Sequence, residues 1–227
     1  SVARSELERL EREHAPLLVF STLSSVTKAV SPVAERREIP LIGLVASDPS
    51  ISREKDSTYV FYPSAEHETE PIFSIIRDTG AQSVGVLHID DAYGRSVVRE
   101  MKRRADDSTV SIDARPYEAS DDELNAAVQE LAGHDAVYLV GFTDQILTMY
   151  EHFTAASYEG ILLSTSTVTL PSVRQEHKLD DIYAGAPLIY NDAFVFAERM
   201  SQRYRERYGR TLSHYAANGY DALKIIA

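Results

Sequence analysis

Short runs of β-branched and aromatic residues alternate along the chain with longer stretches whose apolar positions recur every three to four residues. The short runs predict strands and the longer stretches predict amphipathic helices. Strands are expected at 17–20, 41–44, 59–62, 83–88, 109–112, 136–140, 161–164 and 182–184, and helices at 25–37, 69–79, 96–105, 121–131 and 145–157. This alternation of strand and helix predicts an α/β fold whose parallel sheets carry helices on both faces.

Helix-end signals support this pattern at three places. Ser120 stands where a helix N-cap is expected, and Glu123 follows it three residues later. Phe194, Ala197, Tyr204 and Tyr208 fall on one face of a further predicted helix. Gly80 follows the helix at 69–79 and Gly209 follows this last helix, where a left-handed closing residue favours glycine. The sequence contains no internal repeat and no long linker, so any division into lobes must come from crossings of the chain.

Composition removes several classes of function. The net charge of −12 argues against nucleic acid as a partner, because phosphate contacts need clustered lysines and arginines. The absence of cysteine excludes disulfides and thiolate metal sites. No apolar run approaches the roughly 20 residues of a membrane span. The chain shows no signal peptide and no initiator Met, which indicates a mature product or an excised piece.

Hydroxyl and small residues gather in the loops that follow the predicted strands. They occur at 21–25, 45–49, 90–94, 141–144 and 165–167. In doubly wound sheets these loops carry the working residues. A single loop of this kind is explained by helix capping, since Ser, Thr and Asp are common caps. Five of them at equivalent places favour a binding site for a carboxylate or another polar anion.

Enzyme signatures are missing. No phosphate-binding loop, dinucleotide fingerprint, nucleophile elbow or zinc-protease motif is present, and the histidines show no zinc-like grouping. We therefore expect no catalytic residue, no metal and no cofactor. The pair Asp90-Asp91 is interpreted as a turn and helix cap, and the segment His67–Glu70 as the opening of a helix.

Tyr93 is the most informative aromatic residue. An isolated aromatic residue in such a loop would ordinarily pack in the core. Tyr93 follows two turn-forming residues and precedes Gly94, which favours a ring presented at the surface of a cleft. A tyrosine in such a loop supplies an apolar wall and a hydroxyl donor together.

The run from Val84 to Arg95 resembles the strand, turn and Tyr-Gly of the type I periplasmic binding proteins. More narrowly, it is similar to the branched-chain amino acid (Leu/Ile/Val) substrate-binding family of ABC importers, which are extracellular ligand-binding receptors. Other segments match the family in the same order along nearly the whole chain: 24–25, 34–36, 39–42, 46–49, 59–64, 135–141 and 219–222.

This resemblance implies two Rossmann-like α/β lobes with parallel sheets that close on a ligand. Residues 1–63 with 188–227 would form lobe one, and residues 64–187 lobe two. Carried over by position, the ligand residues would be Ser24, Ser25, Ala46 and Ser47 in lobe one, and Tyr93, Phe142, Thr143 and Ser166 in lobe two. The partners implied are a small-molecule ligand and the membrane permease of an ABC transporter, with a periplasmic or extracellular location.

Two departures from the family pattern modify this expectation. Family members carry an acidic residue near the position of Ser166, where it pairs with the ammonium of an amino acid. A buried ammonium without a counter-charge is costly, so carboxylates, amides and aromatic acids are alternatives to an amino acid. The chain also begins at what corresponds to the family's third helix. Lobe one should therefore be incomplete, which fits an excised fragment, a degenerate lobe or a homo-oligomer that covers it.

Two further functions stay open at this stage. A ligand-sensing domain of a receptor or regulatory protein would have the same fold. A doubly wound hydrolase or transferase would need a nucleophile and base pair, which the sequence does not show. Turnover that is lost when a pair centred on Ser24 or Ser166 is mutated would favour this function.

Overall fold

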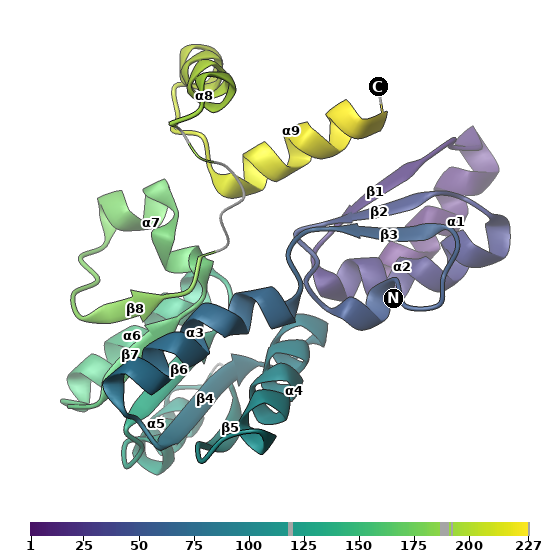
Figure 1. Cartoon of the computed structure of the whole chain (residues 1–227). Helices are drawn as coiled ribbons and strands as arrows, with labels where there is room; N and C mark the ends of the chain where they lie inside the picture. The colour runs from purple at the N-terminus through teal and green to yellow at the C-terminus, as the bar shows by residue number, and fades with distance from the viewer. Residues whose placement is uncertain (118–119, 187–190, 192, 227) are drawn as a thin grey trace. The chain divides into compact units, whose positions relative to one another are not determined.

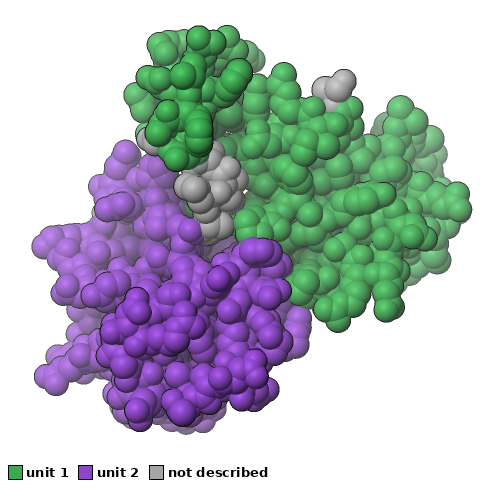
Figure 2. Space-filling model, viewed as in Figure 1, with its two compact units in different colours: residues 1–63, 187–227 green, residues 64–186 purple. Residues whose placement is uncertain are grey.

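The chain divides into two compact units, which Figure 2 colours separately. Unit 1 comprises residues 1–63 with 187–227, and unit 2 comprises residues 64–186. The computed structural model describes residues 1–117, 120–186, 191 and 193–226. The expected return of the chain to lobe one at 187–188 lies outside these residues.

Unit 1 contains a three-stranded parallel sheet in the order β1-β2-β3 (Figure 1). In register, Leu41 of the middle strand lies opposite Val19 on one side and Thr58 on the other. The elements of this unit are α1 (Val2–His14), β1 (Val19–Thr22), α2 (Ser24–Arg37), β2 (Leu41–Leu44), the 3-10 helix η1 (Pro49–Ile51), β3 (Thr58–Phe61), α8 (Val195–Tyr208) and α9 (His214–Ile226).

The core of unit 1 is small. Leu7 of α1, Val33 of α2 and Leu41 of β2 belong to its one cluster of buried apolar side chains among the described residues. Helix α9 is tied to the sheet by Asn218, whose Nδ2 donates to the carbonyl of Phe61 at 2.7 Å. Helix α8 buries none of its side chains.

Unit 2 contains a five-stranded parallel sheet in the order β5-β4-β6-β7-β8. From β4 the chain moves to the edge strand β5 and then back past β4 to β6, so the order reverses between β4 and β6. Its elements are α3 (Ala65–Thr79), β4 (Ser83–Ile89), α4 (Ala92–Asp106), β5 (Ser111–Tyr117), α5 (Asp121–Leu131), β6 (Ala136–Val140), α6 (Thr143–Ala155), β7 (Ile161–Ser164), the 3-10 helix η2 (Ser166–Thr169), α7 (Pro171–Glu176) and β8 (Ile182–Ala184).

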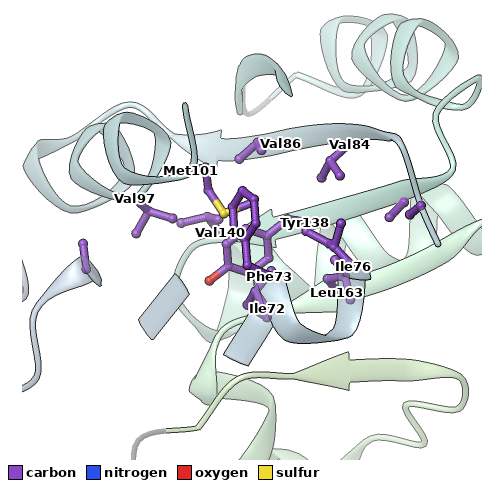
Figure 3. Close-up of a cluster of buried hydrophobic side chains, with 13 residues drawn as sticks. Ile72, Phe73, Ile76, Val84, Val86, Val97, Met101, Tyr138, Val140 and Leu163 are labelled. Carbon is purple, nitrogen blue, oxygen red and sulfur yellow. The ribbon is translucent and has the colours of Figure 1, made fainter. Parts of the chain in front are cut away.

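Helices cover both faces of this sheet (Figure 1). One buried cluster joins β4, β6 and β7 to α3 and α4, with Tyr138 among the side chains in Figure 3. A second cluster joins the same strands to α5 and α6 through Leu131 and Phe153. The burial of β6 on both faces explains its continuous apolar sequence.

The expected parallel α/β architecture is confirmed, with two strands displaced along the chain. The strand expected at 17–20 is β1, Val19–Thr22. The strand expected at 109–112 is β5, Ser111–Tyr117. Pro116 and the polar residues Asp113 and Arg115 concealed it. Because β5 lies at the edge of the sheet, it tolerates a proline and polar side chains.

The three predicted helix-end signals are also confirmed. The Ser120 hydroxyl accepts the N–H of Glu123 at 3.4 Å at the start of α5. Gly80 and Gly209 end α3 and α8 with φ of 75° and 64°, which is the left-handed conformation.

Candidate ligand-binding site

In unit 1 the loops that follow β1 and β2 are joined by Ser24, the first residue of α2. Its Oγ accepts the backbone N–H groups of Ser47 at 3.0 Å and Asp48 at 3.3 Å. Gly43 permits this approach, since a Cβ at Gly43 would lie 2.7 Å from Cγ2 of Thr27 in α2. Two predicted site residues 23 positions apart therefore lie side by side.

Both of these loops contain a strained backbone residue. Leu23, directly before α2, has φ 70°, and Val45, directly after β2, has φ 50°. A β-branched residue such as valine rarely adopts positive φ. Strained residues of this kind concentrate at functional sites, where the surrounding structure holds them in place.

Ser47 carries the most unusual hydroxyl of this region. The residue is 2% exposed, and its Oγ has no hydrogen-bond partner among the described residues. It lies beside the start of α2, whose N-cap residue Leu23 offers no side-chain hydrogen bond. The N–H groups of the first helical turn lack intrahelical acceptors, so this end of α2 favours a negative group.

Asp48 also fixes the loop that follows β2. Its carboxylate is fully buried, and it accepts from Lys28 Nζ at 2.9 Å and from the Ser50 N–H at 3.1 Å. Burial alone would raise the pKa of Asp48, but the hydrogen bonds from Lys28 and Ser50 outweigh it and hold the pKa below its ordinary value. Sequence reasoning missed this ion pair. Asp-Pro at the start of η1 signals a cap, but nothing in the sequence indicates Lys28 as partner.

In unit 2 two aromatic rings meet where the strand order reverses. Tyr93 follows β4 and Phe142 follows β6, and their ring centroids lie 6.0 Å apart with an interplanar angle of 24°. Both side chains are half-buried and pack on the cores of the unit. Ligands of open α/β sheets bind at such reversal points, beyond the carboxyl ends of the strands.

The turn before Tyr93 has the expected structural role. Asp91 is the N-cap of α4, and its Oδ1 accepts the N–H of Gly94 at 2.9 Å. Asp90 pairs with Arg95 at 2.6 Å. A side chain at Gly94 would clash with the carbonyl oxygen of Ile89, so glycine is required here for α4 to start so close to β4.

Hydroxyl groups fill the loop after β7. Thr165 Oγ1 and Thr167 Oγ1 lie 3.1 Å apart, and Thr167 also approaches the carbonyl of Gly141 at 3.5 Å. This contact brings the loop next to the one that contains Phe142. Ser166 is 6% exposed.

The remaining predicted site residues are Ala46, Ser25 and Thr143. Ala46 is fully buried within the loop that Ser24 supports. Ser25 is half-buried and already has an interaction partner. Thr143 is half-buried at the start of α6, a helix whose N-cap Phe142 again offers no side-chain cap.

The described part of the chain offers no metal-binding cluster. It holds no group of three or more His, Cys, Asp or Glu side chains that could bind a metal ion. Within the same residues, no helix is long and apolar enough to cross a membrane.

Solved structures of a ligand-binding receptor and of transporter solute-binding proteins share this fold. An extracellular ligand-binding receptor from Rhodopseudomonas palustris HaA2 has a TM-score of 0.83 at 17% identity, over 98% of this chain and 66% of its own. The substrate-binding protein of a branched-chain amino acid transporter from Streptococcus pneumoniae, in complex with isoleucine, has a TM-score of 0.81 at 17% identity, over 99% and 66%. A solute-binding protein of an ABC transporter from Rhodopseudomonas palustris BisB5, in complex with 3,4-dihydroxybenzoic acid, has 0.79 at 15%, over 99% and 64%.

The chain thus spans about two thirds of the length of these proteins, and its first lobe is partial. No curated protein sequence matches it. The likeness to the solved structures establishes a type I periplasmic-binding-protein fold. A family model described as periplasmic binding protein matches residues 1–227, and the chain therefore belongs to the periplasmic binding protein family.

Proposed function

We propose that this protein is the solute-binding component of an ABC importer and captures a small polar ligand without changing it chemically. The observation that carries the proposal is the buried hydroxyl of Ser47 beside the start of α2, which has no partner in the described chain. An unsatisfied buried hydroxyl costs free energy, and a ligand that accepts its proton would recover that cost.

The groups in unit 1 suit a carboxylate. Ser47 can donate its hydroxyl proton, and Ser24 still has its own proton to donate, because its oxygen only accepts from the loop. The first-turn N–H groups of α2 add donors and partial positive charge. Lys28 is not required, since its charge is matched by Asp48.

The groups in unit 2 suit the apolar body of a small molecule. Tyr93 and Phe142 present partly exposed ring surface, and Ser166 adds a hydroxyl. An apolar surface with a few placed polar groups is typical of small-molecule sites.

Known relatives support a carboxylate ligand. The protein from Streptococcus pneumoniae is solved with isoleucine, and one from Rhodopseudomonas palustris with 3,4-dihydroxybenzoic acid. Both of these ligands carry a carboxylate. The family also supports a periplasmic or extracellular location and a membrane permease as partner.

A thermal-shift screen with amino acids, aliphatic and aromatic acids, and amides tests the proposal, followed by calorimetry on any compound that binds. A ligand at a hundredfold excess over its dissociation constant should raise stability by about 2.7 kcal/mol. Ser47→Ala should weaken binding at least tenfold without lowering the melting temperature of the free protein, because its hydroxyl has no partner to lose among the described residues.

Tyr138→Phe is the matched control. It also removes a buried hydroxyl without a partner in the described chain, but from the core of unit 2. It should leave affinity unchanged. A folded protein that binds nothing in the screen, or a Ser47→Ala variant with full affinity, would contradict the proposal.

A further inference from the structure

We infer that unit 1 carries a separate binding site, along α8 and α9, for a single-chain amphiphile with an anionic head group. All residues of this site belong to unit 1, and none of them lies in the strand-end loops described above. The inference is therefore independent of the proposed function.

The groove lined by α8 and α9 has the size of a small-molecule site. Its volume is about 780 Å³, and ligand pockets usually enclose about 300 to 1,000 Å³. Its lining residues extend along α8 from Phe196 to Tyr208, and Ala217 and Tyr220 of α9 also line it. At a rise of 1.5 Å per residue this part of α8 is about 18 Å long. An extended molecule therefore fits the groove better than a compact solute.

Exposed rings supply much of the lining. Phe194 and Phe196 are 67% and 85% exposed, and the ring centroids of Tyr204 and Tyr208 lie 4.8 Å apart. Single exposed apolar residues are common, but a contiguous group of them marks an interaction site.

Helix α8 itself has a reason to need an occupant. Its 14 residues bury no side chain, and an isolated helix of this length is marginally stable in water without packing. An apolar chain laid in the groove would cover the rings and stabilise α8.

Three arginines give the groove its charge. Arg199, Arg203 and Arg207 recur one helical turn apart, and all three line the groove. None of them forms an ion pair with another described residue, although the Arg207 guanidinium lies 5.8 Å from the centroid of the Tyr208 ring. Asp221 is the single acid among the lining residues, so the lining carries a formal charge of +2 in a chain whose net charge is −12.

The rings and the charge together select the class of ligand. A cationic amphiphile would be repelled by the arginines, and a polyanion would be repelled by the acidic remainder of the chain. A molecule with an alkyl chain and one carboxylate can lay its chain on the rings and its head group on an arginine. The arginine fork binds a carboxylate through two parallel hydrogen bonds. A medium-chain fatty acid is the simplest compound of this kind.

Three compounds with the same ten-carbon chain test the inference by titration calorimetry on the full chain, each below its micelle concentration. Decanoate is anionic, decanol is neutral and decyltrimethylammonium is cationic. We expect one decanoate to bind in the groove at least tenfold more tightly than decanol, and decyltrimethylammonium to bind more weakly than both. Added salt should weaken the binding of decanoate but not that of decanol, because exposed charges are screened.

Variants separate this groove from the strand-end loops, which are also proposed to bind carboxylates. Arg203→Gln should weaken decanoate at least fivefold and leave decanol unchanged, whereas Phe196→Ser should weaken both. Arg53→Gln is the matched control, because it removes an exposed arginine of the same unit from outside the groove. It should change neither affinity, and Ser47→Ala should leave binding in the groove intact.

Decanoate that binds Arg203→Gln as tightly as the unmodified protein, or no more tightly than decanol does, would overturn the inference. It would also be overturned if sedimentation velocity showed a dimer that Phe196→Ser dissociates, since a second copy would then occupy the groove. Capture of the protein by anionic vesicles in preference to monomeric decanoate would overturn it as well. Loss of the proposed function in Ser47→Ala, with decanoate binding in the groove retained, would leave it standing.

Discussion

A glycine at the start of α4 positions the aromatic residue of the candidate site. Gly94 directly follows Tyr93, donates its N–H to Asp91 and lies against the carbonyl of Ile89. Replacing a helical glycine by alanine ordinarily stabilises a protein, because the unfolded chain loses freedom. At this position the added Cβ has no space, so α4 must move away from β4 and carry the Tyr93 ring with it.

We therefore expect Gly94→Ala to destabilise the protein by about 2 to 3 kcal/mol and to weaken ligand binding. Gly219→Ala is the matched control, because Gly219 lies inside α9 and a Cβ added to it would meet no described neighbour within 4 Å. It should be neutral or stabilise by about 0.5 to 1 kcal/mol. Urea unfolding measures the change in stability caused by each substitution. Equal changes would show that the contact between Gly94 and the Ile89 carbonyl does not exclude a Cβ.

At the scale of elements, Asp135 links the starts of the neighbouring strands β4 and β6. The strand order of the sheet reverses between these two strands. Asp135 Oδ2 accepts the N–H groups of Gln82 and Ser83 and the hydroxyl of Ser83, each at 2.9 Å. The N–H of Gln82, then the N–H and hydroxyl of Ser83, hold the pKa of Asp135 below its ordinary value of 3.8.

This lowered pKa predicts a stability contribution that depends on pH. A carboxyl whose pKa is lower in the folded state stabilises the protein above its unfolded pKa, and that contribution is lost as pH falls through the folded value. The stability difference between the unmodified protein and Asp135→Asn should thus be constant above about pH 5 and shrink below about pH 4. Urea unfolding across this range measures it, with Asp78→Asn, at an exposed position of α3, as control. A difference that does not change with pH would contradict the role of the charge.

The elements were predictable wherever the local sequence determines them. Helix α5 has the expected bounds because Ser120 caps it, and β6 does because both of its faces are buried. Strand β5 was misplaced because an edge strand tolerates polar residues and Pro116. Helix α9 carries exposed apolar residues such as Leu223 and Ile225, so its pattern did not predict a single buried face.

The candidate site was predictable only in part. The loop positions follow from the strands, so Ser47, Tyr93 and Ser166 could be named in advance. The bond from Ser24 to the Ser47 N–H and the pairing of Lys28 with Asp48 could not. These contacts join residues about twenty positions apart, and they depend on the register of β1 and β2 and on how closely α2 packs at Gly43.

At the scale of the whole molecule the two units differ in how completely each buries its apolar residues. Unit 2 is one continuous segment with five strands and a buried cluster on each face of its sheet. In its described residues unit 1 has three strands and one small cluster, and α8 buries none of its residues. It also leaves Phe196 and Ile225 85% and 71% exposed. Because burial of apolar surface supplies most of the free energy of folding, the stability of the protein should reside mainly in unit 2.

The segment 64–186 should therefore fold alone, whereas residues 1–63 should not. We expect the isolated unit 2 to unfold in one cooperative urea transition with a stability within the ordinary range of about 5 to 15 kcal/mol. Residues 1–63 contain three strands, two α-helices and one 3-10 helix but only one cluster of buried apolar side chains, so they should show no cooperative transition. Circular dichroism during urea unfolding of both fragments gives the comparison. If residues 1–63 unfolded cooperatively and 64–186 did not, the sheet with helices on both faces would not be the stable part of this fold.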